Sequence, residues 1–290
     1  MEPKLLIVDG HAYAYRAFHA IRQLTSPDGQ PTNAIYGFIK MLGKMEHQLR
    51  PTHRAVVWDG GLAAKRLEAL PEYKSQRPPM PAALGPQISG LQDYLRAASI
   101  ASLCAEGVEA DDWIAGLARR AEADGFQVII ASADKDFMQL VGPRIGLLNP
   151  NDKSERIWTA DEVRAKAGVR PDQVVDWLSL VGDAVDNIPG VPGVGSKTAA
   201  ELLNQFDSIE ALIHRVSEVR SEKVRCNLEA AVELVRRNQE LIRLQERSDL
   251  PGSLDELVVR PPDVAELRRL YSEWGFQTLL AQLHETPLLL

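Results

Sequence analysis

Leu5-Leu6-Ile7-Val8-Asp9 is a short apolar run that ends in an acid, and this arrangement recurs along the first half of the chain. Asp59 follows Ala55-Val56-Val57-Trp58, and Asp134 and Asp136 come closely after Val128-Ile129-Ile130-Ala131. Short apolar runs of this kind are typical of buried strands in a parallel sheet. Because the carboxyl ends of such strands open onto one crevice, acids that lie far apart in the sequence are expected to converge there.

The order of apolar and amphipathic segments predicts an α/β fold with a mostly parallel central sheet flanked by helices. We expect strands at 4–9, 54–59, 100–104, 126–131 and 144–148, and helices at 33–49 and 111–124. Residues 60–87 carry five prolines, which predict an extended excursion from the sheet. Beyond Trp158 a helical subdomain is predicted, with helices at 160–167, 171–181, 197–205, 208–215, 220–244 and 263–273.

With 290 residues and 45% hydrophobic content, the chain can bury a substantial core. Its first apolar run is too short for a signal peptide, and no stretch approaches the roughly 20 apolar residues of a membrane span. Cys104 and Cys226 have no partners at metal-ligand spacing and lie in segments that we expect to be buried. Reduced thiols of this kind favour a soluble, cytoplasmic protein.

The formal charge of −7 argues against a nucleic-acid ligand at first sight. Nine acids, however, lie where apolar segments end or helices begin: Asp9, Asp59, Glu109, Asp111, Asp112, Asp134, Asp136, Asp183 and Asp186. Setting these aside leaves 31 of the 40 acidic residues against 33 basic ones, so the remaining scaffold is nearly neutral. Net charge therefore neither supports nor excludes DNA.

The nine acids favour a metal site over a purely structural role. Acids cap helices, but capping explains only one or two of the three between 109 and 112. Two carboxylates about 5 Å apart repel by roughly 3 kcal/mol at an effective dielectric near 20, so a convergent set predicts bound cations. Because no histidine or cysteine accompanies the acids, the expected ions are Mg²⁺ or Mn²⁺.

Two such ions can serve phosphodiester hydrolysis, which makes a two-metal-ion nuclease the favoured chemistry. Dehalogenase-like phosphatases also open with an Asp at the end of a strand. Their nucleophile needs a second Asp two residues later, where this chain has His11. That alternative is therefore disfavoured.

The segment from Asn187 to Ala199 is rich in glycine and resembles a Walker A loop at first sight. It fails that template, because Ser196 separates Gly195 from Lys197 and no strand precedes it. We expect two helices joined by a glycine turn, with a phosphate held at the N-terminus of the second. The residues involved are Gly190, Gly193, Gly195, Ser196 and Lys197. An ordinary turn between helices is the alternative.

Basic residues gather in the proline-rich excursion. Lys65 and Arg66 precede Tyr73, Lys74 and Arg77, and together they offer phosphate contacts and a base-stacking ring. A solvated loop is the alternative interpretation. Arg16 lies two helical turns after Asp9 and is predicted to point back to the crevice.

Taken together, these motifs resemble the structure-specific 5′ nucleases, which include flap endonucleases and the 5′ to 3′ exonuclease domain of bacterial DNA polymerase I. The resemblance is carried by Val8-Asp9-Gly10-His11, Val57-Trp58-Asp59, Glu109-Ala110-Asp111-Asp112 and the pairs Asp134 with Asp136 and Asp183 with Asp186. It runs nearly end to end and covers all nine acids. It implies a PIN-like nuclease core at 1–181 with a helical arch at 62–95. A DNA-binding helical subdomain at 182–290 would follow, with a helix-two-turn-helix around 188–205.

The resemblance also implies roles for single residues. Glu109, Asp111, Asp112, Asp134 and Asp136 would surround one metal region, Asp183 and Asp186 would serve another, and Asp9 and Asp59 would orient both. Lys74 matches the family's catalytic lysine, and Arg16 matches its phosphate-contacting arginine. DNA contacts are implied for Tyr73, Arg77, Lys65, Arg66 and the glycine turn, which would also bind K⁺.

We therefore expect a 5′ to 3′ exonuclease and 5′-flap endonuclease that uses two or more Mg²⁺ or Mn²⁺ ions in DNA replication and repair. Its partners would be DNA with 5′ flaps, nicks or 5′ ends and a DNA polymerase, and the protein would be a monomer. The chain is interpreted as a free-standing enzyme or an excised domain. Lys65 departs from the pattern, because relatives often place an aromatic residue there. An RNA-directed nuclease of the same architecture and a non-catalytic protein that binds branched DNA are the alternatives.

Overall fold

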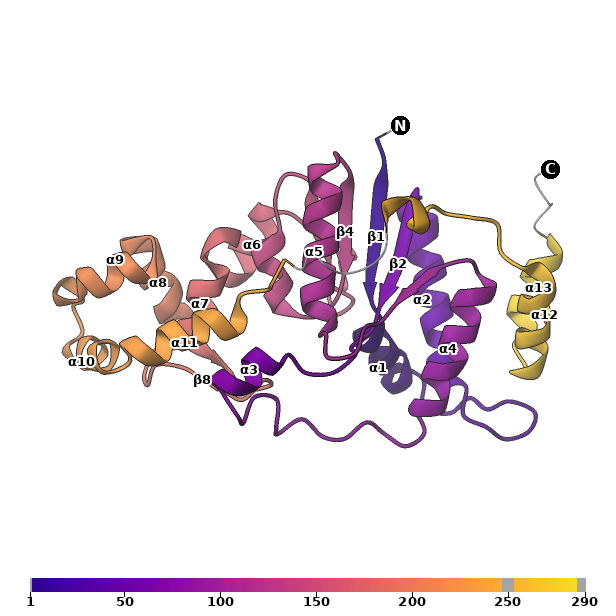
Figure 1. Cartoon of the computed structure of the whole chain (residues 1–290), viewed down its shortest axis with the longest axis horizontal. Helices are drawn as coiled ribbons and strands as arrows, with labels where there is room; N and C mark the ends of the chain where they lie inside the picture. Colours follow the sequence, from indigo (N-terminus) through magenta and orange to yellow (C-terminus); the bar gives the residue numbers. More distant parts are fainter. Residues whose placement is uncertain (1, 247–252, 286–290) are drawn as a thin grey trace.

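A computed structural model describes residues 2–246 and 253–285 of the chain. The first half contains β1 (Lys4–Asp9), α1 (Gly10–Ala20), α2 (Asn33–Leu49), β2 (His53–Val57), α3 (Ala64–Ala69), α4 (Gly85–Ala97), β3 (Ala101–Leu103), α5 (Ala110–Ala123), β4 (Gln127–Ala131), the 3₁₀ helix η1 (Lys135–Leu140), β5 (Ile145–Leu148) and β6 (Ile157–Trp158). Figure 1 shows an elongated molecule with the sheet near its centre.

The central sheet has six strands in the order β3-β2-β1-β4-β5-β6. The first five run parallel, and β6 pairs with β5 in the antiparallel direction. The prediction of a mostly parallel sheet flanked by helices is therefore confirmed, and all five expected strands are present with slightly different ends. The short edge strand β6 was not expected, because two residues carry too little periodicity to be recognised.

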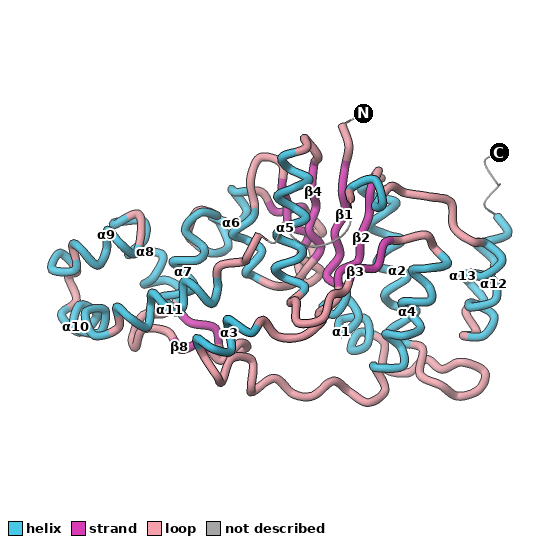
Figure 2. Tube along the Cα trace, viewed as in Figure 1, coloured by secondary structure: helices cyan, strands magenta, loops and turns pink. Residues whose placement is uncertain are grey.

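Alternation along the strands divides the core into two layers. Leu5 and Ile7 of β1 face a cluster that includes α5, whereas Leu6 and Val8 face a cluster that includes α1, α2 and α4. Both faces of the sheet are thus covered, which explains why its strands read as continuous apolar runs. Figure 2 shows the magenta strands between these helices.

The second half is helical. It contains α6 (Ala160–Ala167), η2 (Pro171–Gln173), α7 (Val174–Val181), the short strands β7 (Gly182–Asp183) and β8 (Ile188–Pro189), α8 (Ser196–Phe206), α9 (Ile209–His214), η3 (Val216–Glu218), α10 (Glu222–Ala230), α11 (Val232–Ile242), η4 (Leu254–Leu257), α12 (Val264–Glu273) and α13 (Gln277–Glu285). The helix predicted at 220–244 is in fact two helices. Ala231 leaves the helical conformation with φ −106° and ψ 11°, and its N–H bonds to Leu228 in a tighter turn.

The helices of the predicted subdomain at 182–290 lie in two separate parts of the molecule. Helices α7 to α11 form a lobe at the left of Figure 1, whereas α12 and α13 lie at the opposite end. Leu267, Leu270 and Trp274 of α12 and its C-cap join the buried cluster of α2 and α4. The part of the predicted subdomain at 247–252 and beyond 285 lies outside the described residues.

The proline-rich excursion also differs from its predicted limits. Residues 71–77 form turns after α3, and the chain then runs along the lower edge of Figure 1 to α4. The predicted arch at 62–95 therefore includes a core helix, because Leu91 and Leu95 of α4 are fully buried. Pro86 explains why this helix starts where it does, since proline is well suited to a first helical turn.

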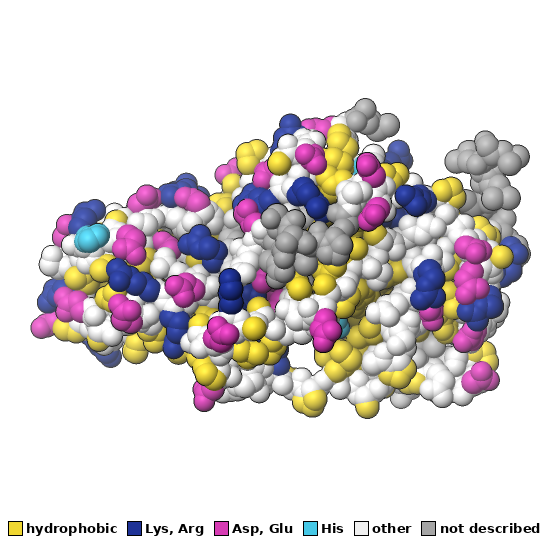
Figure 3. Space-filling model, in the orientation of Figure 1, with side chains coloured by type: hydrophobic (Ala, Val, Ile, Leu, Met, Phe, Trp, Pro, Cys, Tyr) yellow, Lys and Arg dark blue, Asp and Glu magenta, His cyan; other side chains and the backbone are white. Residues whose placement is uncertain are grey.

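Other predictions concerned the surface. Cys104 and Cys226 are exposed, which corrects the expectation of buried thiols: Cys104 follows the edge strand β3, and Cys226 lies on the outer side of α10. No helix in the described ranges is long and apolar enough to cross a membrane. Basic and acidic side chains are interspersed on the face shown in Figure 3, in agreement with a nearly neutral scaffold.

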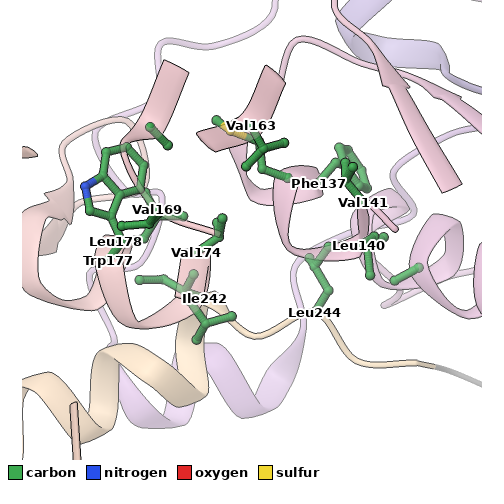
Figure 4. Packing of buried hydrophobic residues seen from close by; sticks show 14 of the residues in the cluster. Phe137, Leu140, Val141, Val163, Val169, Val174, Trp177, Leu178, Ile242 and Leu244 are labelled. Carbon is green, nitrogen blue, oxygen red and sulfur yellow. The ribbon is translucent and has the colours of Figure 1, made fainter. Parts of the chain in front are cut away.

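Buried apolar packing continues from the sheet into the helical lobe. Figure 4 shows Phe137 and Leu140 of η1, Val174 and Leu178 of α7, and Ile242 at the end of α11 in one cluster. Phe137 is 0% exposed, and it lies in η1, which Asp134 caps and whose first turn carries Asp136. This packing fixes the lobe against the end of the sheet that carries the acids.

Phe137→Ala should therefore lower the free energy of unfolding by about 3–5 kcal/mol, because the cavity left by the ring cannot collapse fully. Chemical denaturation followed by circular dichroism would measure the loss. Val259→Ala, at an exposed position, is the matched control and should change the free energy by less than about 0.5 kcal/mol. Equal effects of the two substitutions would contradict this description of the core.

Candidate active site

The carboxyl ends of β1 and β4 open onto a cleft. The strand order changes direction between them, and ligands of open α/β sheets bind at such switch points. The cleft has a volume of about 700 Å³. Six of the nine predicted acids line it: Asp9, Asp59, Asp111, Asp134, Asp183 and Asp186. These acids, which are distant in the sequence, meet where the sheet topology predicts.

Asp9 ends β1 and also starts α1. One carboxylate oxygen accepts from the N–H of Ala12 at 3.0 Å, and the other accepts from the hydroxyl of Ser132 at 2.8 Å. The Ser132 oxygen also accepts from the N–H of Asp134 at 3.1 Å, so one side chain joins the ends of β1 and β4. Burial raises the pKa of Asp9 to about 6 despite these hydrogen bonds.

Asp134 is the N-cap of η1, directly after β4, and Asp136 lies in the first turn of η1. The Asp134 side chain accepts from the N–H of Asp136 at 2.9 Å and thereby caps η1. The Oδ1 atom of Asp136 is buried and has no hydrogen-bond partner among the described residues. Burial, followed by the charge of Asp134, raises the pKa of Asp136 well above its ordinary value.

Asp183 and Asp186 belong to a tight hairpin between β7 and β8, not to a helical turn. Asp183 accepts from the N–H of Val185 at 2.9 Å and lies 3.3 Å from the amine of Lys135. Asp186 pairs with Arg77 and accepts a weak hydrogen bond from the Tyr73 hydroxyl at 3.4 Å. Both acids are buried at the cleft.

The acids at the start of α5 point in different directions. Asp111 lines the cleft, and burial and then the charge of Asp134 raise its pKa well above the ordinary value. Glu109 and Asp112 lie outside the cleft lining and instead contact Arg66. Asp59 reaches this helix from β2 and accepts from the N–H of Ala110 at 2.9 Å.

Arg66 lies in the interior, which corrects its predicted role as an exposed DNA contact. Its side chain is 3% exposed and donates to both oxygens of Asp112, at 2.8 and 2.9 Å, and to Glu109. The arrangement is a buried bidentate pair in which a single guanidinium satisfies two carboxylates. A phosphate would have to displace these carboxylates to reach Arg66.

Tyr73 and Lys74 are also buried, although the sequence predicts an accessible stacking ring beside an accessible amine. The Lys74 amine contacts Glu109 and lies 3.8 Å from Asp111 and 3.9 Å from Asp186. Burial lowers the pKa of Lys74, but Asp111, Tyr73 and the other two carboxylates outweigh it, so the amine stays charged. The Tyr73 hydroxyl donates to Glu109 at 3.3 Å.

The remaining predicted basic contacts are exposed. Arg77 lines the cleft, whereas Lys65 lies on the outer side of α3. Arg16 does not point back to the acids as predicted: its guanidinium donates to Asn151, and it lines a separate pocket between α1 and α2. Arg16 lies two turns along α1, and at this distance from Asp9 its side chain lies beyond the cleft.

The glycine turn lies between β8 and α8. The two helices expected to flank it, α7 and α8, are therefore separated by the β7–β8 hairpin as well as by the turn. Gly190 has no room for a side chain, because a Cβ atom would lie 2.1 Å from the carbonyl oxygen of Val181. Gly193 has φ +78°, a conformation that favours glycine. Gly195 caps α8, and Gly193, Gly195, Ser196 and Lys197 are all exposed.

The acids at the cleft fit a hard divalent cation in their chemistry. Within residues 2–246 and 253–285, no three acids, histidines or cysteines already surround one point as metal ligands do, because basic side chains stand among them. The unpartnered buried carboxylate oxygen of Asp136 and the raised pKa values of Asp9, Asp111 and Asp134 fit a set of carboxylates that can bind a cation. Oxygen-only donors suit Mg²⁺ or Mn²⁺.

Sequence reasoning missed several residues at the cleft. Ser132, His11 and Tyr15 contact the acids or line the cleft with them. Ser132 could have been found, because a serine directly after a strand and two residues before Asp134 is suited to a local turn. Burial lowers the pKa of His11, which therefore accepts at Nδ1 from the N–H of Asp59 at 3.2 Å.

Comparison with known proteins places this arrangement in a family. The family model described as 5′-3′ exonuclease, N-terminal resolvase-like domain, matches residues 4–168, and the C-terminal SAM fold of the same family matches residues 169–265. A 5′-3′ exonuclease of Aquifex aeolicus is 37% identical over 278 residues, with 96% of this chain and 94% of the relative covered. The chain thus belongs to the 5′-3′ exonuclease family, and the resemblance noted in its sequence is confirmed.

Other relatives are longer. DNA polymerase I of Bacillus caldotenax is 38% identical over 289 residues, which cover 99% of this chain but 33% of that protein. The chain spans about a third of the length of such relatives.

Among solved structures, bacteriophage T5 5′-exonuclease with bound zinc has a TM-score of 0.69 at 24% identity, covering 97% of this chain and all of that one. The catalytic core of Rad2 with DNA substrate has a TM-score of 0.66 at 18% identity, covering 97% and 91%. Both share the fold.

Arg66→Ala should lower the free energy of unfolding by about 3–5 kcal/mol, because it leaves Glu109 and Asp112 buried with reduced compensation. Guanidinium denaturation monitored by tryptophan fluorescence would measure it. Arg96→Ala removes an exposed pair with Asp93 on α4 and should cost less than about 1 kcal/mol. If the two variants were equally stable, Arg66 would not be the buried ion-pair partner described.

Proposed function

We propose that the chain is a divalent-metal-dependent nuclease that hydrolyses DNA phosphodiester bonds near a 5′ end, as a 5′ to 3′ exonuclease and 5′-flap endonuclease. The observation that carries the proposal is the gathering of six carboxylates with Lys74 and Arg77 at one cleft. Membership of the 5′-3′ exonuclease family supports the reaction class. Roles in DNA replication and repair follow as part of the same proposal.

Seven acids are proposed to hold the metal ions. They are the six that line the cleft, together with Asp136, whose buried oxygen lacks a partner: Asp9, Asp59, Asp111, Asp134, Asp136, Asp183 and Asp186. Two Mg²⁺ or Mn²⁺ ions held by this set would offset more than half of its negative charge and would supply an activated water and stabilisation of the leaving oxygen. Glu109 is proposed to act through Lys74, which it contacts. The zinc ions of the T5 5′-exonuclease structure support a metal site in this fold.

Lys74 and Arg77 are proposed to bind the scissile phosphate. Both line the cleft beside Asp186, and Lys74 is tied to that residue through its backbone, because its N–H donates to the carbonyl oxygen of Asp186 at 3.0 Å. Cation binding would release the Lys74 amine from the carboxylates that surround it. A phosphate entering between these two side chains would replace those carboxylates as their partner.

The glycine turn is proposed to bind the phosphates of the duplex. Backbone carbonyl groups of the turn are proposed to bind K⁺ as well. Its exposed backbone lies at the N-terminus of α8, and Lys197 extends from that turn with 92% of its side chain exposed. Contacts of this kind fix register without reading bases. The T5 flap endonuclease and Rad2 structures with DNA support a DNA ligand for this fold.

The long relatives suggest a partner. In DNA polymerase I of Bacillus caldotenax, the matching part makes up a third of the protein. We propose that this chain, as a monomer in the cytoplasm, works beside a DNA polymerase whose strand displacement creates the 5′ flaps.

Asp134→Ala should abolish cleavage of a labelled 5′-flap substrate in Mg²⁺ or Mn²⁺, because it removes a carboxylate from the centre of the cleft, while DNA binding in chelator stays measurable. Product formation on denaturing gels and fluorescence anisotropy would report the two properties. Asp161→Ala, an exposed acid on α6, should cleave like the wild type. Blunt duplex and RNA of the same sequence test the substrate, and equal cutting of unstructured RNA would reject the DNA assignment.

Lys197→Ala should weaken duplex binding and reduce the slope of log K against log salt by about 1, because one phosphate contact is lost. Anisotropy titrations in chelator at several KCl concentrations would measure both quantities. Lys40→Ala removes an exposed lysine of α2 and should leave the slope unchanged. An unchanged slope in Lys197→Ala would show that the turn does not contact phosphates.

A further inference from the structure

Residues 241–245, named the strap, carry the chain from the end of α11 towards the α/β core (Figure 1). The last carbonyl groups of a helix and the amides that follow it lack partners within the helix. In the strap, side chains from three other elements supply those partners. The elements are α3, α5 and η1, and two of them, α5 and η1, also line the acidic cleft through Asp111 and Lys135.

Gln139 of η1 makes a two-way contact with the strap. Its Nε2 donates to the carbonyl oxygen of Ile242 at 3.1 Å, and its Oε1 accepts from the N–H of Leu244 at 3.0 Å. The same Nε2 donates to the carbonyl oxygen of Asp136 at 3.0 Å. One side chain therefore joins the strap to the turn that carries Asp134 and Asp136.

Asp112 and Arg66 hold the neighbouring strap residues. The N–H of Gln245 donates to Asp112 Oδ1 at 2.9 Å, and Arg66 donates to the carbonyl oxygens of Leu241 at 2.9 Å and Arg243 at 3.4 Å. Together with Gln139, these side chains satisfy a backbone group of every strap residue. Both oxygens of Asp112 are used in this way, one by Gln245 and Arg66 and the other by Arg66 alone.

Packing alone does not locate the strap. A cavity of about 1040 Å³ borders it and is lined by Arg66, Gln139, Arg243 and Leu244. Leu241, Ile242 and Leu244 pack into the buried apolar cluster on the other side of the strap. On the open side, the hydrogen bonds restrain the strap backbone relative to α5 and η1. Asp111 on α5 and Asp134 before η1 face each other as like charges, so the spacing of these two elements needs a restraint.

We propose that Gln139 and Asp112 are positioning residues that grip the strap and thereby hold α5 and η1 at the spacing that brings Asp111, Asp134 and Asp136 to the reacting phosphate. Asp112 is thus a structural holder of the site and not a direct metal ligand. The proposal rests on the proposed nuclease function. It assigns to Gln139, whose side-chain hydrogen bonds reach none of the residues that line the cleft, an effect on the rate of the chemical step.

Gln139→Leu removes the hydrogen bonds to Ile242 and Leu244 with little change in side-chain size. Amide exchange at Leu244, followed by NMR or mass spectrometry, should accelerate at least about tenfold, because its acceptor is lost. The kcat for 5′-flap cleavage should fall about tenfold or more, since small misplacements of reacting groups have effects of this size. The KM for DNA should stay within about twofold, and Mn²⁺ binding followed by EPR without DNA should weaken.

Gln173→Leu is the matched control. Gln173 is a buried glutamine of η2 that donates to the carbonyl oxygens of Leu203 and Asp207 at 3.1 and 2.8 Å, in the helical lobe. Its loss should lower the melting temperature by a similar amount while leaving kcat, Mn²⁺ binding and exchange at Leu244 unchanged. An equal fall of kcat in both variants would overturn the proposal, because general destabilisation would then explain the effect.

An unchanged kcat in Gln139→Leu despite faster exchange at Leu244 would also overturn it. If that variant does not fold, Gln139→Glu keeps the acceptor for Leu244 and loses the donated hydrogen bonds. Exchange at Leu244 should then stay unchanged, while kcat and Mn²⁺ binding should fall, and an unchanged kcat in this variant would overturn the proposal. The proposed function fails separately, if the wild type does not cut DNA. If the wild type cuts DNA and the variant keeps the wild-type kcat and Mn²⁺ affinity, only the proposed role of the strap is rejected.

Discussion

The mutual repulsion of carboxylates at one end of the sheet is the constraint on which the structure depends. At separations near 5 Å each pair costs roughly 3 kcal/mol at an effective dielectric near 20. Positive groups come from two segments to oppose this repulsion: Arg66, Lys74 and Arg77 from the excursion after β2, and Lys135 from η1. The excursion, the hairpin at 182–189 and η1 are therefore held near the sheet by the same charges that a substrate and its ions would use.

The sheet and the position of the cleft could be predicted from the sequence because both follow from local patterns. Apolar runs that end in acids specify parallel strands, and parallel strands place their carboxyl ends together. The direction of the acids on α5 could not be predicted in the same way. Asp111 and Asp112 are adjacent and therefore point about 100° apart on a helix. Which of them faces the cleft depends on how α5 packs against β1 and the strap.

Burial of Tyr73, Lys74 and Arg66 was not predictable for a related reason. A basic, proline-rich segment has the composition of a solvated loop, and only partners far away in the sequence draw it inwards. Arg66 meets Leu241 and Asp112, and Gln139 meets Leu244, across separations of 46 to 175 residues. Contacts at such distances leave no periodicity in the sequence, whereas Ser132, which acts two residues away on Asp134, leaves a recognisable local pattern.

The hairpin between α7 and the glycine turn has a consequence for the geometry of any product. Its two strands meet so closely that a Cβ atom at Gly182 would lie 2.4 Å from the backbone nitrogen of Gly190. Asp183 and Asp186 lie on this hairpin, and the glycine turn follows directly after β8. The hairpin therefore behaves as a spacer of fixed length. Under the proposed function, with cleavage at these acids and duplex binding at the turn, the hairpin would set the number of nucleotides between the two, and an insertion into it would change that number.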